Sequence, residues 1–316
     1  MSTQKQQYHL PVLLKETIDA LDIRPDGVYL DGTAGGGGHS FAIASKLTTG
    51  RLISLDQDPE AVAEASARLA GLPAQVVQTN FVNMGTVLHD LGIDGVDGIL
   101  LDIGVSSHQL DEGERGFSYH VDAPLDMRMS KSGETAADLV NSYTEQQLST
   151  LFYRNADEKF SRQIARAIVR ERAVEPITTT LRLAEIIKES VPAAARRGAH
   201  PARRVFQALR MEVNHELDCL SDALDNAFRC LHVGGRLAVI TFHSLEDRMV
   251  KLRFNEWRQG CICPPDFPVC LCKRTPPAKL VLRKPVEASE QELADNNRSR
   301  SARLRCIEKI HDLYTD

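Results

Sequence analysis

The segment at residues 29–40 reads YLDGTAGGGGHS, and its four consecutive glycines follow closely on a short apolar run. Glycine has no side chain, so the backbone at residues 35–38 can adopt positive φ angles and approach a ligand closely. Turns of this kind join the first strand of a nucleotide-binding sheet to the helix that follows it. The segment therefore predicts a cofactor-binding loop at the edge of a parallel sheet.

An acidic residue ends a second apolar run about 20 residues beyond this turn, the sequence separation at which nucleotide-binding folds place an acid that binds ribose hydroxyls. The run RLISLDQD at residues 51–58 carries it as Asp56. The fingerprint of nicotinamide cofactors would need Gly or Ala at position 40, where the chain has Ser40. Asp31, just before the glycines, would repel a pyrophosphate but suits a cationic cofactor. S-adenosylmethionine is such a cofactor.

The first hundred residues alternate between strand and helix patterns, which is typical of an α/β fold with a parallel sheet and helices on both faces. Strands are expected at residues 28–31, 51–56, 75–78, 98–103 and 236–242, with a helix at 60–70 and another at 205–231. Two further apolar runs, at 279–283 and 303–307, are expected to pair antiparallel at the sheet's edge. The polar stretch at 287–301 predicts a loop.

Between residues 104 and 205 the strand pattern disappears and helical periodicity takes over. Helices are expected there at residues 144–152, 160–172 and 180–190. An inserted helical domain explains this change. We therefore expect a discontinuous cofactor-binding domain at residues 1–110 and 205–316, interrupted by a mainly helical substrate-recognition domain at 111–204.

The composition is that of a globular protein, with 42% hydrophobic and 26% charged residues in a chain of 316. The first residues lack the apolar core of a signal peptide, and no apolar run approaches the roughly 18 residues of a membrane span. We therefore expect a cytoplasmic protein with no membrane partner. Its 7 cysteines are then expected to be reduced thiols or metal ligands.

Arginines gather at two places although the net charge is -5. The first group comprises Arg196, Arg197, Arg203, Arg204 and Arg210, and the second comprises Arg298, Arg300, Arg303 and Arg305. Clustered arginines bind nucleic-acid phosphates, but they also occur on solvated helix faces, and both interpretations stay open.

Four cysteines form two close pairs in CICPPDFPVCLC: Cys261, Cys263, Cys270 and Cys272. Four thiolates are enough for a tetrahedral zinc site. The C-x-C spacing, however, is less typical of structural zinc than C-x2-C. The pattern leaves both a zinc site and reduced loop thiols without a metal open.

Taken together, the motifs resemble those of the bacterial 16S ribosomal RNA (cytosine-N4)-methyltransferases, the RsmH or MraW family. The resemblance spans nearly the whole chain. It rests on HLPVLLKE at 9–16, DGTAGGGGHS at 31–40, LDQDP at 55–59, LLDIGVSSHQLD at 100–111, RGFSY at 115–119, PLDMRM at 124–129, HPARRVFQALRMEVNHEL at 200–217 and FHSLEDR at 242–248.

This resemblance implies a class I, Rossmann-like methyltransferase sheet with an inserted, mainly helical second domain. It also implies that S-adenosylmethionine is the cofactor and that 16S rRNA, within the small ribosomal subunit, is the partner. The methylated base would be one cytosine of the decoding region. A monomer and a homodimer both remain open.

The family's cofactor contacts would fall on Gly37, Gly38, His39, Asp56, Phe81, Asp102 and Gln109, and Gly35 belongs to the same turn. The residues themselves suit these roles. Asp56 can bind the ribose, Phe81 can stack on the adenine, and the glycine turn can admit the methionine end. His39 is assigned a binding role only.

Methylation of cytosine N4 needs help from the protein, because the amine's lone pair is delocalised into the ring. A polar acceptor near the amino hydrogens can orient N4 and take up the released proton. Asp102 is the first candidate, since it ends the fourth predicted strand, where parallel sheets bind ligands. His243, after the fifth strand, is the second candidate, although it can equally cap the following helix.

Other amino-methyltransferases carry an (Asn/Asp/Ser)-Pro-Pro-aromatic motif at this strand end, but here the sequence is DIGVSS, so their mechanism does not transfer. Two other classes of function compete with a methyltransferase. A nicotinamide-dependent oxidoreductase would lack its glycine fingerprint. A non-catalytic RNA-binding factor would not need the glycine turn, Asp56 and Asp102 together.

Overall fold

The computed structural model describes residues 11–106, 109, 112–198, 200–261, 263–264, 267–269, 271–272 and 274–312. The chain divides into two compact units, one formed by Met1–Gly104 with Cys219–Asp316 and the other by Val105–Asp218. The sequence had placed these divisions after residues 110 and 204. The later division lies farther along because Val205, Phe206 and Leu209 are buried in the helical unit's core.

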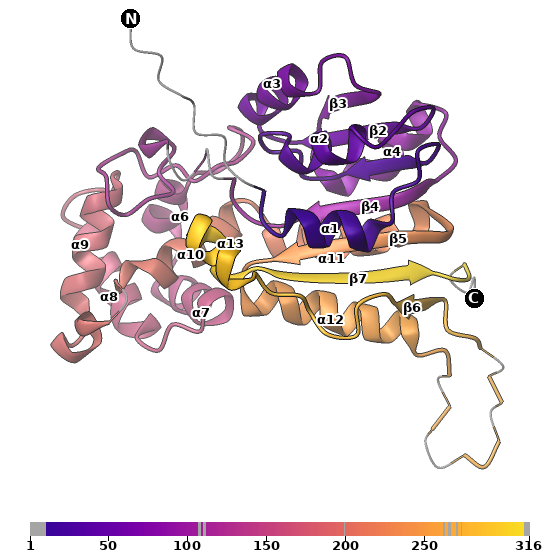
Figure 1. The fold of residues 1–316 in the computed structure, drawn as a ribbon. Helices are drawn as coiled ribbons and strands as arrows, with labels where there is room; N and C mark the ends of the chain where they lie inside the picture. The colour runs from indigo at the N-terminus through magenta and orange to yellow at the C-terminus, as the bar shows by residue number, and fades with distance from the viewer. Residues whose placement is uncertain are drawn as a thin grey trace, which may run out of the picture. The chain divides into compact units, whose positions relative to one another are not determined.

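The first unit is built on a seven-stranded sheet with the order β3-β2-β1-β4-β5-β7-β6 (Figure 1). Its strands are β1 (Val28–Asp31), β2 (Arg51–Asp56), β3 (Ala74–Gln78), β4 (Val96–Asp102), β5 (Leu231–Thr241), β6 (Ala278–Leu280) and β7 (Arg303–Lys309). The pairs among β1 to β5 are parallel, whereas β7 runs antiparallel to both β5 and β6. The antiparallel pair predicted for the edge is confirmed.

Helices cover both faces of this sheet. On one face, α1 (Leu14–Leu21) and α2 (Gly38–Ala44) pack with Leu69, which follows α3 (Pro59–Arg68). The other face carries α4 (Met84–Asp90), α11 (Glu216–Cys230) and α12 (Ser244–Arg258). Residues along β4 alternate between the two cores, with Ile99 and Leu101 in one and Leu100 in the other. The doubly wound α/β architecture predicted from the sequence is confirmed.

The single helix predicted at residues 205–231 is wrong, because the chain forms α10 (Ala202–Val213) and then α11. His215 adopts a positive φ of 49°, which a continuing helix does not allow. The Asn214 side-chain amide donates to the carbonyl oxygens of Met127 and Arg210 at 2.8 and 2.9 Å. These contacts hold the chain in a turn.

The loop predicted at residues 287–301 is also wrong, because this stretch forms α13 (Glu290–Asp295) and the short 3-10 helix η4 (Asn297–Ser301). The Ser289 hydroxyl accepts a hydrogen bond from the Glu292 backbone at 3.2 Å and so caps α13. The Glu292 carboxylate in turn accepts from the Leu13 backbone N–H at 2.7 Å. This cap and this distant contact thus help to stabilise a polar helix that lacks apolar periodicity.

The second unit is helical. It contains α6 (Ala136–Ser142), α7 (Glu145–Ala156), α8 (Ser161–Arg172), α9 (Thr180–Ser190), α10 and the 3-10 helices η2 (Gly113–Arg115) and η3 (Ala193–Arg197). Thr135 and Thr144 close capping boxes at the starts of α6 and α7. The core of the unit buries Phe152, Ile164 and Leu183 from α7, α8 and α9.

No helix within the described ranges has both the length and the apolar character needed to cross a lipid bilayer.

Candidate functional site

Three acidic residues end neighbouring strands of the sheet. Asp31 is the last residue of β1, Asp56 of β2 and Asp102 of β4. The strand order reverses between β1 and β4, and ligands of open α/β sheets bind beyond the carboxyl ends of the strands at such a point. The predicted cofactor site therefore lies where the topology places a ligand.

The glycine turn between β1 and α2 depends on two residues with positive φ. Gly37 has a φ of 74° and begins α2 as its N-cap, and a Cβ there would lie 3.2 Å from the Ala65 Cα. Gly35 has a φ of 50°, and the Thr33 carbonyl oxygen, at 4.0 Å, is the nearest described atom that a Cβ there would meet. Gly37 thus permits close packing against α3, while the backbone at Gly35 remains accessible.

Asp56 fastens the glycine turn to β2. One carboxylate oxygen accepts a hydrogen bond from the Gly35 backbone N–H at 2.8 Å, and the other accepts from the Asp58 N–H at 2.9 Å. Burial raises the pKa of Asp56 from 3.8 to about 6. Each carboxylate oxygen has two acceptor positions, so a carboxylate held in this way can still accept from ribose hydroxyls.

Asp31 lies fully buried beneath the turn. It accepts hydrogen bonds from the Ser40 hydroxyl at 2.6 Å and from the Thr33 backbone at 3.0 Å. Ser40 also contacts the Ser54 hydroxyl of β2 at 2.9 Å. Burial raises the pKa of Asp31. Asp31 therefore anchors the start of α2 to the sheet.

Asp102 has a strongly perturbed environment as well. Its backbone N–H donates to the Thr33 hydroxyl at 2.7 Å, which ties the ends of β1 and β4 together. Burial, together with the charges of Asp31 and Glu246, raises the pKa of Asp102 from 3.8 to about 8. Its buried Oδ1 atom has no hydrogen-bond partner among the described residues. A buried acceptor without a partner is costly, so it marks a position suited to a ligand donor.

His39 stands beside Asp102, with 3.6 Å between its Nδ1 and the Asp102 Oδ2. Its Nε2 contacts the Val12 carbonyl oxygen at 3.0 Å. Because a carbonyl only accepts, the proton of a neutral ring lies on Nε2. Burial lowers the pKa of His39. His39 thus faces Asp102 through an unprotonated nitrogen.

Phe81 begins the 3-10 helix η1 (Phe81–Asn83), which follows β3. A Cβ on Gly32 would lie 3.1 Å from the Phe81 Cβ, so the aromatic side chain stands beside the end of β1. Asn80 holds it there, since its side chain caps η1 at Val82 and donates to Gln57 at 2.9 Å. The ring is only partly buried and can offer a face to a base.

Gln109 belongs to the second unit, whereas the other predicted contacts belong to the first. Its side-chain oxygen accepts from the Ser106 backbone N–H at 3.1 Å, and its own N–H donates to the Ser106 hydroxyl at 3.2 Å. The cofactor contact at Gln109 stays a prediction.

His243 is the N-cap of α12, directly after β5. Its Nδ1 accepts from the Glu246 backbone N–H at 3.4 Å, and the Glu246 carboxylate accepts from the backbone of Phe242 and of His243 at 2.9 and 3.2 Å. The His243 Nε2 lies 2.9 Å from the Glu246 Oε1, without the alignment of a hydrogen bond. The geometry supports the capping role, and a catalytic role stays a prediction.

Sequence reasoning missed the polar residues that hold the acids in place. Thr33, Ser40 and Ser54 supply the hydroxyls of the network, and Val12 supplies the carbonyl for His39. Thr33 and Ser40 stand in the glycine motif itself, so their spacing around Asp31 was an available signal. Nothing in the local sequence pointed to Ser54 or Val12.

Several arginines of the predicted phosphate-binding groups are engaged within the protein. Arg210 forms a bidentate ion pair with Glu216 at 2.7 and 2.8 Å. Arg196 and Arg204 donate to backbone carbonyls, those of Val191 at 3.1 Å and Asp157 at 2.7 Å. Arg197 and Arg203 are exposed and have no ion pair or hydrogen bond to other described side chains. Of the first group, these two therefore stay the better candidates for the predicted phosphate contacts.

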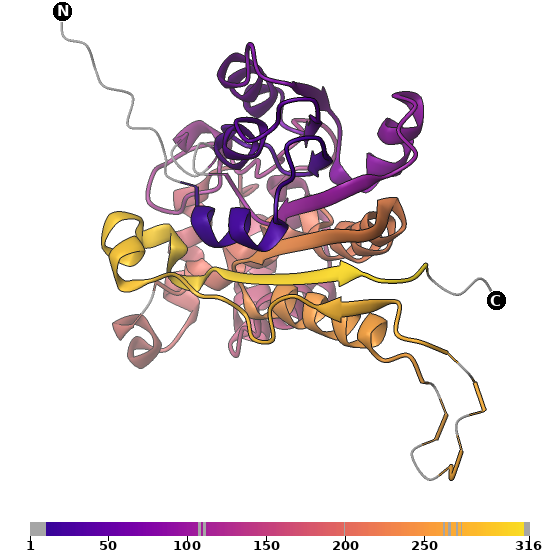
Figure 2. The same cartoon turned by 45° about the vertical axis from the view of Figure 1, so that its right-hand side comes forward.

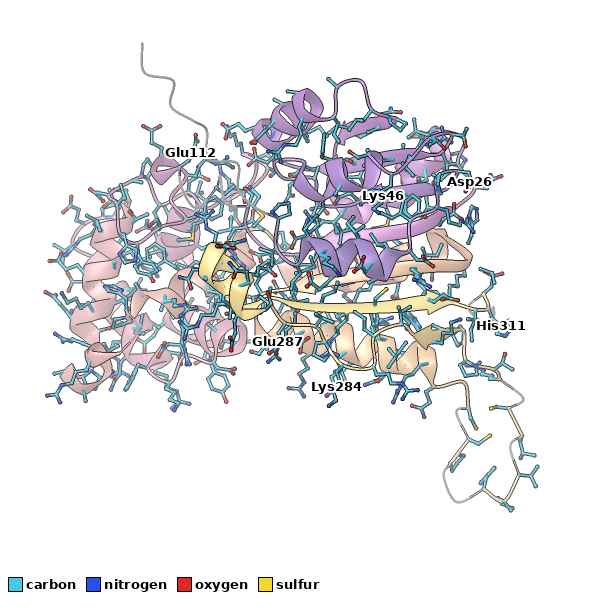
Figure 3. All side chains as sticks on the ribbon, viewed as in Figure 1. Asp26, Lys46, Glu112, Lys284, Glu287 and His311 are labelled. Atoms are coloured by element: carbon cyan, nitrogen blue, oxygen red, sulfur yellow. The ribbon has the colours of Figure 1, made fainter. Side chains whose placement is uncertain are left out.

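The C-terminal group is partly neutralised in the same way. Arg305 binds Asp247 at 2.7 and 3.1 Å, and Arg303 contacts Asp247 at 3.3 Å. Arg303 also lies 3.2 Å from Glu287, the residue labelled in Figure 3. Burial would raise the pKa of Asp247, but the two guanidinium groups outweigh it and hold that pKa below its usual value. Arg300 remains exposed.

Three of the four cysteines singled out in the sequence, Cys261, Cys263 and Cys272, lie together in the loop between α12 and β6. Cys270 lies outside the described residues.

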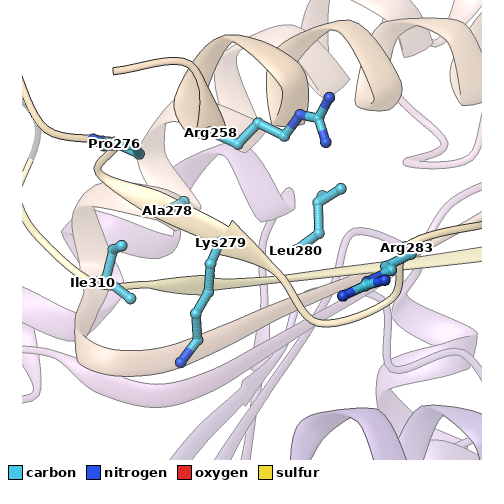
Figure 4. A pocket seen from close by; sticks show the side chains of 7 residues that line it. All are labelled: Arg258, Pro276, Ala278, Lys279, Leu280, Arg283 and Ile310. Atoms are coloured by element: carbon cyan, nitrogen blue, oxygen red, sulfur yellow. The ribbon is translucent and has the colours of Figure 1, made fainter. Parts of the chain in front are cut away.

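A surface pocket of about 450 Å³ lies between the end of α12 and β6 (Figure 4). Its lining is Arg258, Pro276, Ala278, Lys279, Leu280, Arg283 and Ile310. Lys279 is paired with Glu308 at 2.6 Å. None of the predicted site residues lines this pocket, so it is separate from the carboxyl edge of the sheet.

Comparison with known proteins gives matches over almost the whole chain. Residues 6–310 match the MraW methylase family. The ribosomal RNA small subunit methyltransferase H of Heliobacterium modesticaldum is 52% identical over 309 residues, which cover 96% of this chain and 99% of that protein. The protein of the same name from Symbiobacterium thermophilum is 54% identical over 308 residues, covering 96% of this chain and 97% of that protein.

Solved structures match at a lower level. An rRNA methylase from Streptococcus thermophilus aligns with a TM-score of 0.42 and 11% identity, covering 94% of each chain. The family assignment rests on the sequence matches.

Proposed function

Because this chain belongs to the MraW methylase family, we propose that it methylates the exocyclic N4 amine of a specific cytosine in the decoding region of 16S ribosomal RNA. S-adenosylmethionine is the methyl donor. The relatives named as small-subunit ribosomal RNA methyltransferases support the RNA substrate. The choice of cytosine N4 rests on the motif blocks the chain shares with the (cytosine-N4)-methyltransferases. Such a substrate would place the enzyme in the bacterial cytoplasm, acting on the small subunit.

The single observation that carries the proposal is the buried Oδ1 of Asp102 beside the glycine turn, which has no hydrogen-bond partner in the described part of the chain. It is an acceptor at the point where the sheet's topology places a ligand. The amine to be methylated and the cofactor's own ammonium group are both hydrogen-bond donors that can satisfy it.

The residues present fit the cofactor. Asp56 retains acceptor positions for the ribose, and the partly buried Phe81 can cover the adenine. The accessible backbone at Gly35 suits the methionine end. We assign the cofactor to Gly35, Gly37, Gly38, His39, Asp56, Phe81, Asp102 and Gln109.

When bound, the cofactor supplies an electrophilic methyl group on a sulfonium. The protein's task is to present the amine, because the N4 lone pair is delocalised into the pyrimidine ring. Asp102 can accept a hydrogen bond from N4, orient its lone pair toward the methyl group and receive the proton that the amine loses.

This role requires the ionised carboxylate, whereas burial keeps the pKa of Asp102 at about 8 in the protein alone. A nearby positive charge favours the ionised form of a carboxyl group. The sulfonium of the cofactor is such a charge, so its binding is expected to lower the pKa of Asp102 and prepare it as the acceptor.

A methyl-transfer assay on purified small subunits and on free 16S rRNA tests the proposal. The protein is given methyl-labelled S-adenosylmethionine, and the digested RNA is analysed by mass spectrometry for N4-methylcytidine. The expected product is N4-methylcytidine at one position, lost in Asp102→Asn. Label in another nucleoside would overturn the assignment of N4. No transfer to either substrate, together with binding of NAD in calorimetry, would favour an oxidoreductase instead.

A further inference from the structure

The loop between α12 and β6 is closed at its base and extends away from the sheet of the first unit (Figures 1 and 2). A Cβ on Gly260 would lie 2.4 Å from the Pro276 backbone nitrogen and 2.7 Å from the Thr275 carbonyl carbon. Only glycine allows this approach, so the two ends of the loop touch. The intervening residues form a single closed excursion of the chain.

Within this excursion the sulfur atoms of Cys261, Cys263 and Cys272 all lie within 4.8 Å of one another. The Cys261 and Cys272 sulfurs are 3.7 Å apart, far beyond the roughly 2.05 Å of a disulfide bond. Zinc–sulfur bonds of about 2.3 Å place two ligands of a tetrahedral site about 3.8 Å apart. In the metal-free form the Cys272 Sγ donates a hydrogen bond to the Cys261 Sγ, and the same separation suits two ligands of one metal ion.

Backbone amides point at the third sulfur. The N–H groups of Leu271 and Cys272 donate to the Cys263 Sγ at 3.3 and 3.4 Å. Ligands of metal ions are commonly oriented by hydrogen bonds from the surrounding protein, so these two amides suit a ligand sulfur at Cys263. The thiolate is the form of cysteine that binds metals.

The large apolar side chains described in this loop are exposed. Phe267, Val269 and Leu271 are 48, 67 and 69% exposed, so its apolar side chains do not form a core. Ordering a loop of this length costs conformational entropy. Metal binding can supply the missing free energy, as it does in small domains that fold around zinc.

We propose that Cys261, Cys263 and Cys272 bind a structural zinc ion that holds this loop in its closed form. Zinc is the metal of choice because thiolate ligands are soft and the separation suits a tetrahedral site. Each bound cysteine releases its thiol proton, so binding is expected to weaken at low pH. Cys270, the fourth cysteine of the sequence pattern, lies outside the described residues, and the proposal does not depend on it.

Metal analysis of the full-length protein tests this inference. The protein is expressed in zinc-supplemented medium and purified with reductant but without chelator or a metal-affinity tag. About one zinc per chain is expected by mass spectrometry of the elements. Cys263→Ser and Cys272→Ser should each lose most of the bound zinc. The matched control, Cys230→Ser at the end of α11, should keep it. Less than about a fifth of a zinc per chain in reduced wild-type protein, or full zinc in both loop variants, would overturn the proposal.

Cobalt substitution provides a second readout that does not depend on how the zinc variants behave during purification. Thiolate ligands give Co²⁺ strong near-ultraviolet charge-transfer absorption, whereas nitrogen and oxygen ligands do not. The wild-type protein and Cys230→Ser should show this absorption, and Cys263→Ser should lose about a third of it or more. Circular dichroism checks that each variant keeps its fold. An absence of thiolate absorption in folded, reduced wild-type protein would contradict the assignment, whatever its methyltransferase activity.

Discussion

The Nδ1 of His39 lies 3.6 Å from the Oδ2 of Asp102, while the Nε2 of the same ring contacts the Val12 carbonyl oxygen. Burial lowers the pKa of His39, and burial together with neighbouring acids raises the pKa of Asp102. A neutral histidine facing a protonated acid is therefore the favoured state at neutral pH. The site gains a group able to take up the proton of the amine only when Asp102 has lost its own.

Methyl transfer is accordingly expected to rise with pH. With the pKa of Asp102 at about 8, kcat/KM for the free enzyme should increase about tenfold per pH unit below that value and level off above it. The measurement is the initial rate of methyl transfer at pH values below and above this pKa, with S-adenosylmethionine kept well below its KM so that the rate reports the free enzyme. Asp102→Asn should reduce the rate by about a hundredfold or more and remove the dependence. A flat profile for the wild-type enzyme, with the chemical step rate-limiting, would exclude Asp102 as the acceptor.

The same carboxyl group should make the fold less stable at high pH. The folded-state pKa is raised, so the contribution is present below the unfolded value of 3.8 and is lost as pH rises through about 8. The free energy of unfolding of Asp102→Asn should therefore exceed that of wild type by about 1–3 kcal/mol near the folded-state pKa, and by little near the unfolded-state value. Urea unfolding at both pH values measures the difference.

Asp97 provides a control with the opposite sign. Burial would raise its pKa, but the Val28 backbone N–H, His232 and Arg24 outweigh burial and lower it. The stabilisation from Asp97 is therefore present at neutral pH and lost on acidification. Asp97→Asn should destabilise the protein at neutral pH and have less effect in acid. Parallel pH trends would contradict one of the two assignments: that of Asp97 if the stability of both variants relative to wild type rises with pH, and that of Asp102 if it falls.

Cofactor binding should weaken in mild acid because of Asp56. Its pKa of about 6 means that it becomes protonated below that pH and loses acceptor capacity for the ribose hydroxyls. Calorimetry with S-adenosylmethionine should show about a tenfold loss of affinity one pH unit below the pKa. Asp56→Asn should bind S-adenosylmethionine about tenfold or more weakly than wild type at neutral pH, and its affinity should depend less on pH. An Asp56→Asn variant that binds as tightly as wild type would remove Asp56 from the cofactor site.

His243→Asn separates capping from catalysis. Asparagine is a favourable N-cap, so it should retain the hydrogen bond to the Glu246 backbone while removing the imidazole. If His243 only caps α12, activity should stay within about twofold of wild type, while His243→Ala should lose about 1 kcal/mol of stability. A large fall in kcat for a stable His243→Asn variant would instead assign a proton-handling role to the ring.

Local sequence patterns predicted the elements that are defined by short runs of apolar residues or by a regular apolar period. β1 and β2 have the expected bounds because each is a short apolar run between turn residues. The break between α10 and α11 could not be read in this way, since apolar periodicity continues through it. It depends on Asn214 binding the Met127 carbonyl, which is remote in sequence. Similarly, α13 depends on the contact between Glu292 and Leu13.

The amino-acid sequence by itself determined that acids would end three parallel strands beside a glycine turn, because strand periodicity and glycine conformations are properties of short segments. Only the tertiary structure decided how these acids behave. The burial of Asp102, the field of Asp31 and Glu246, and the orientation of His39 by Val12 all arise from segments distant in the chain. Charge interactions and desolvation depend on distance in space, and folding alone sets those distances.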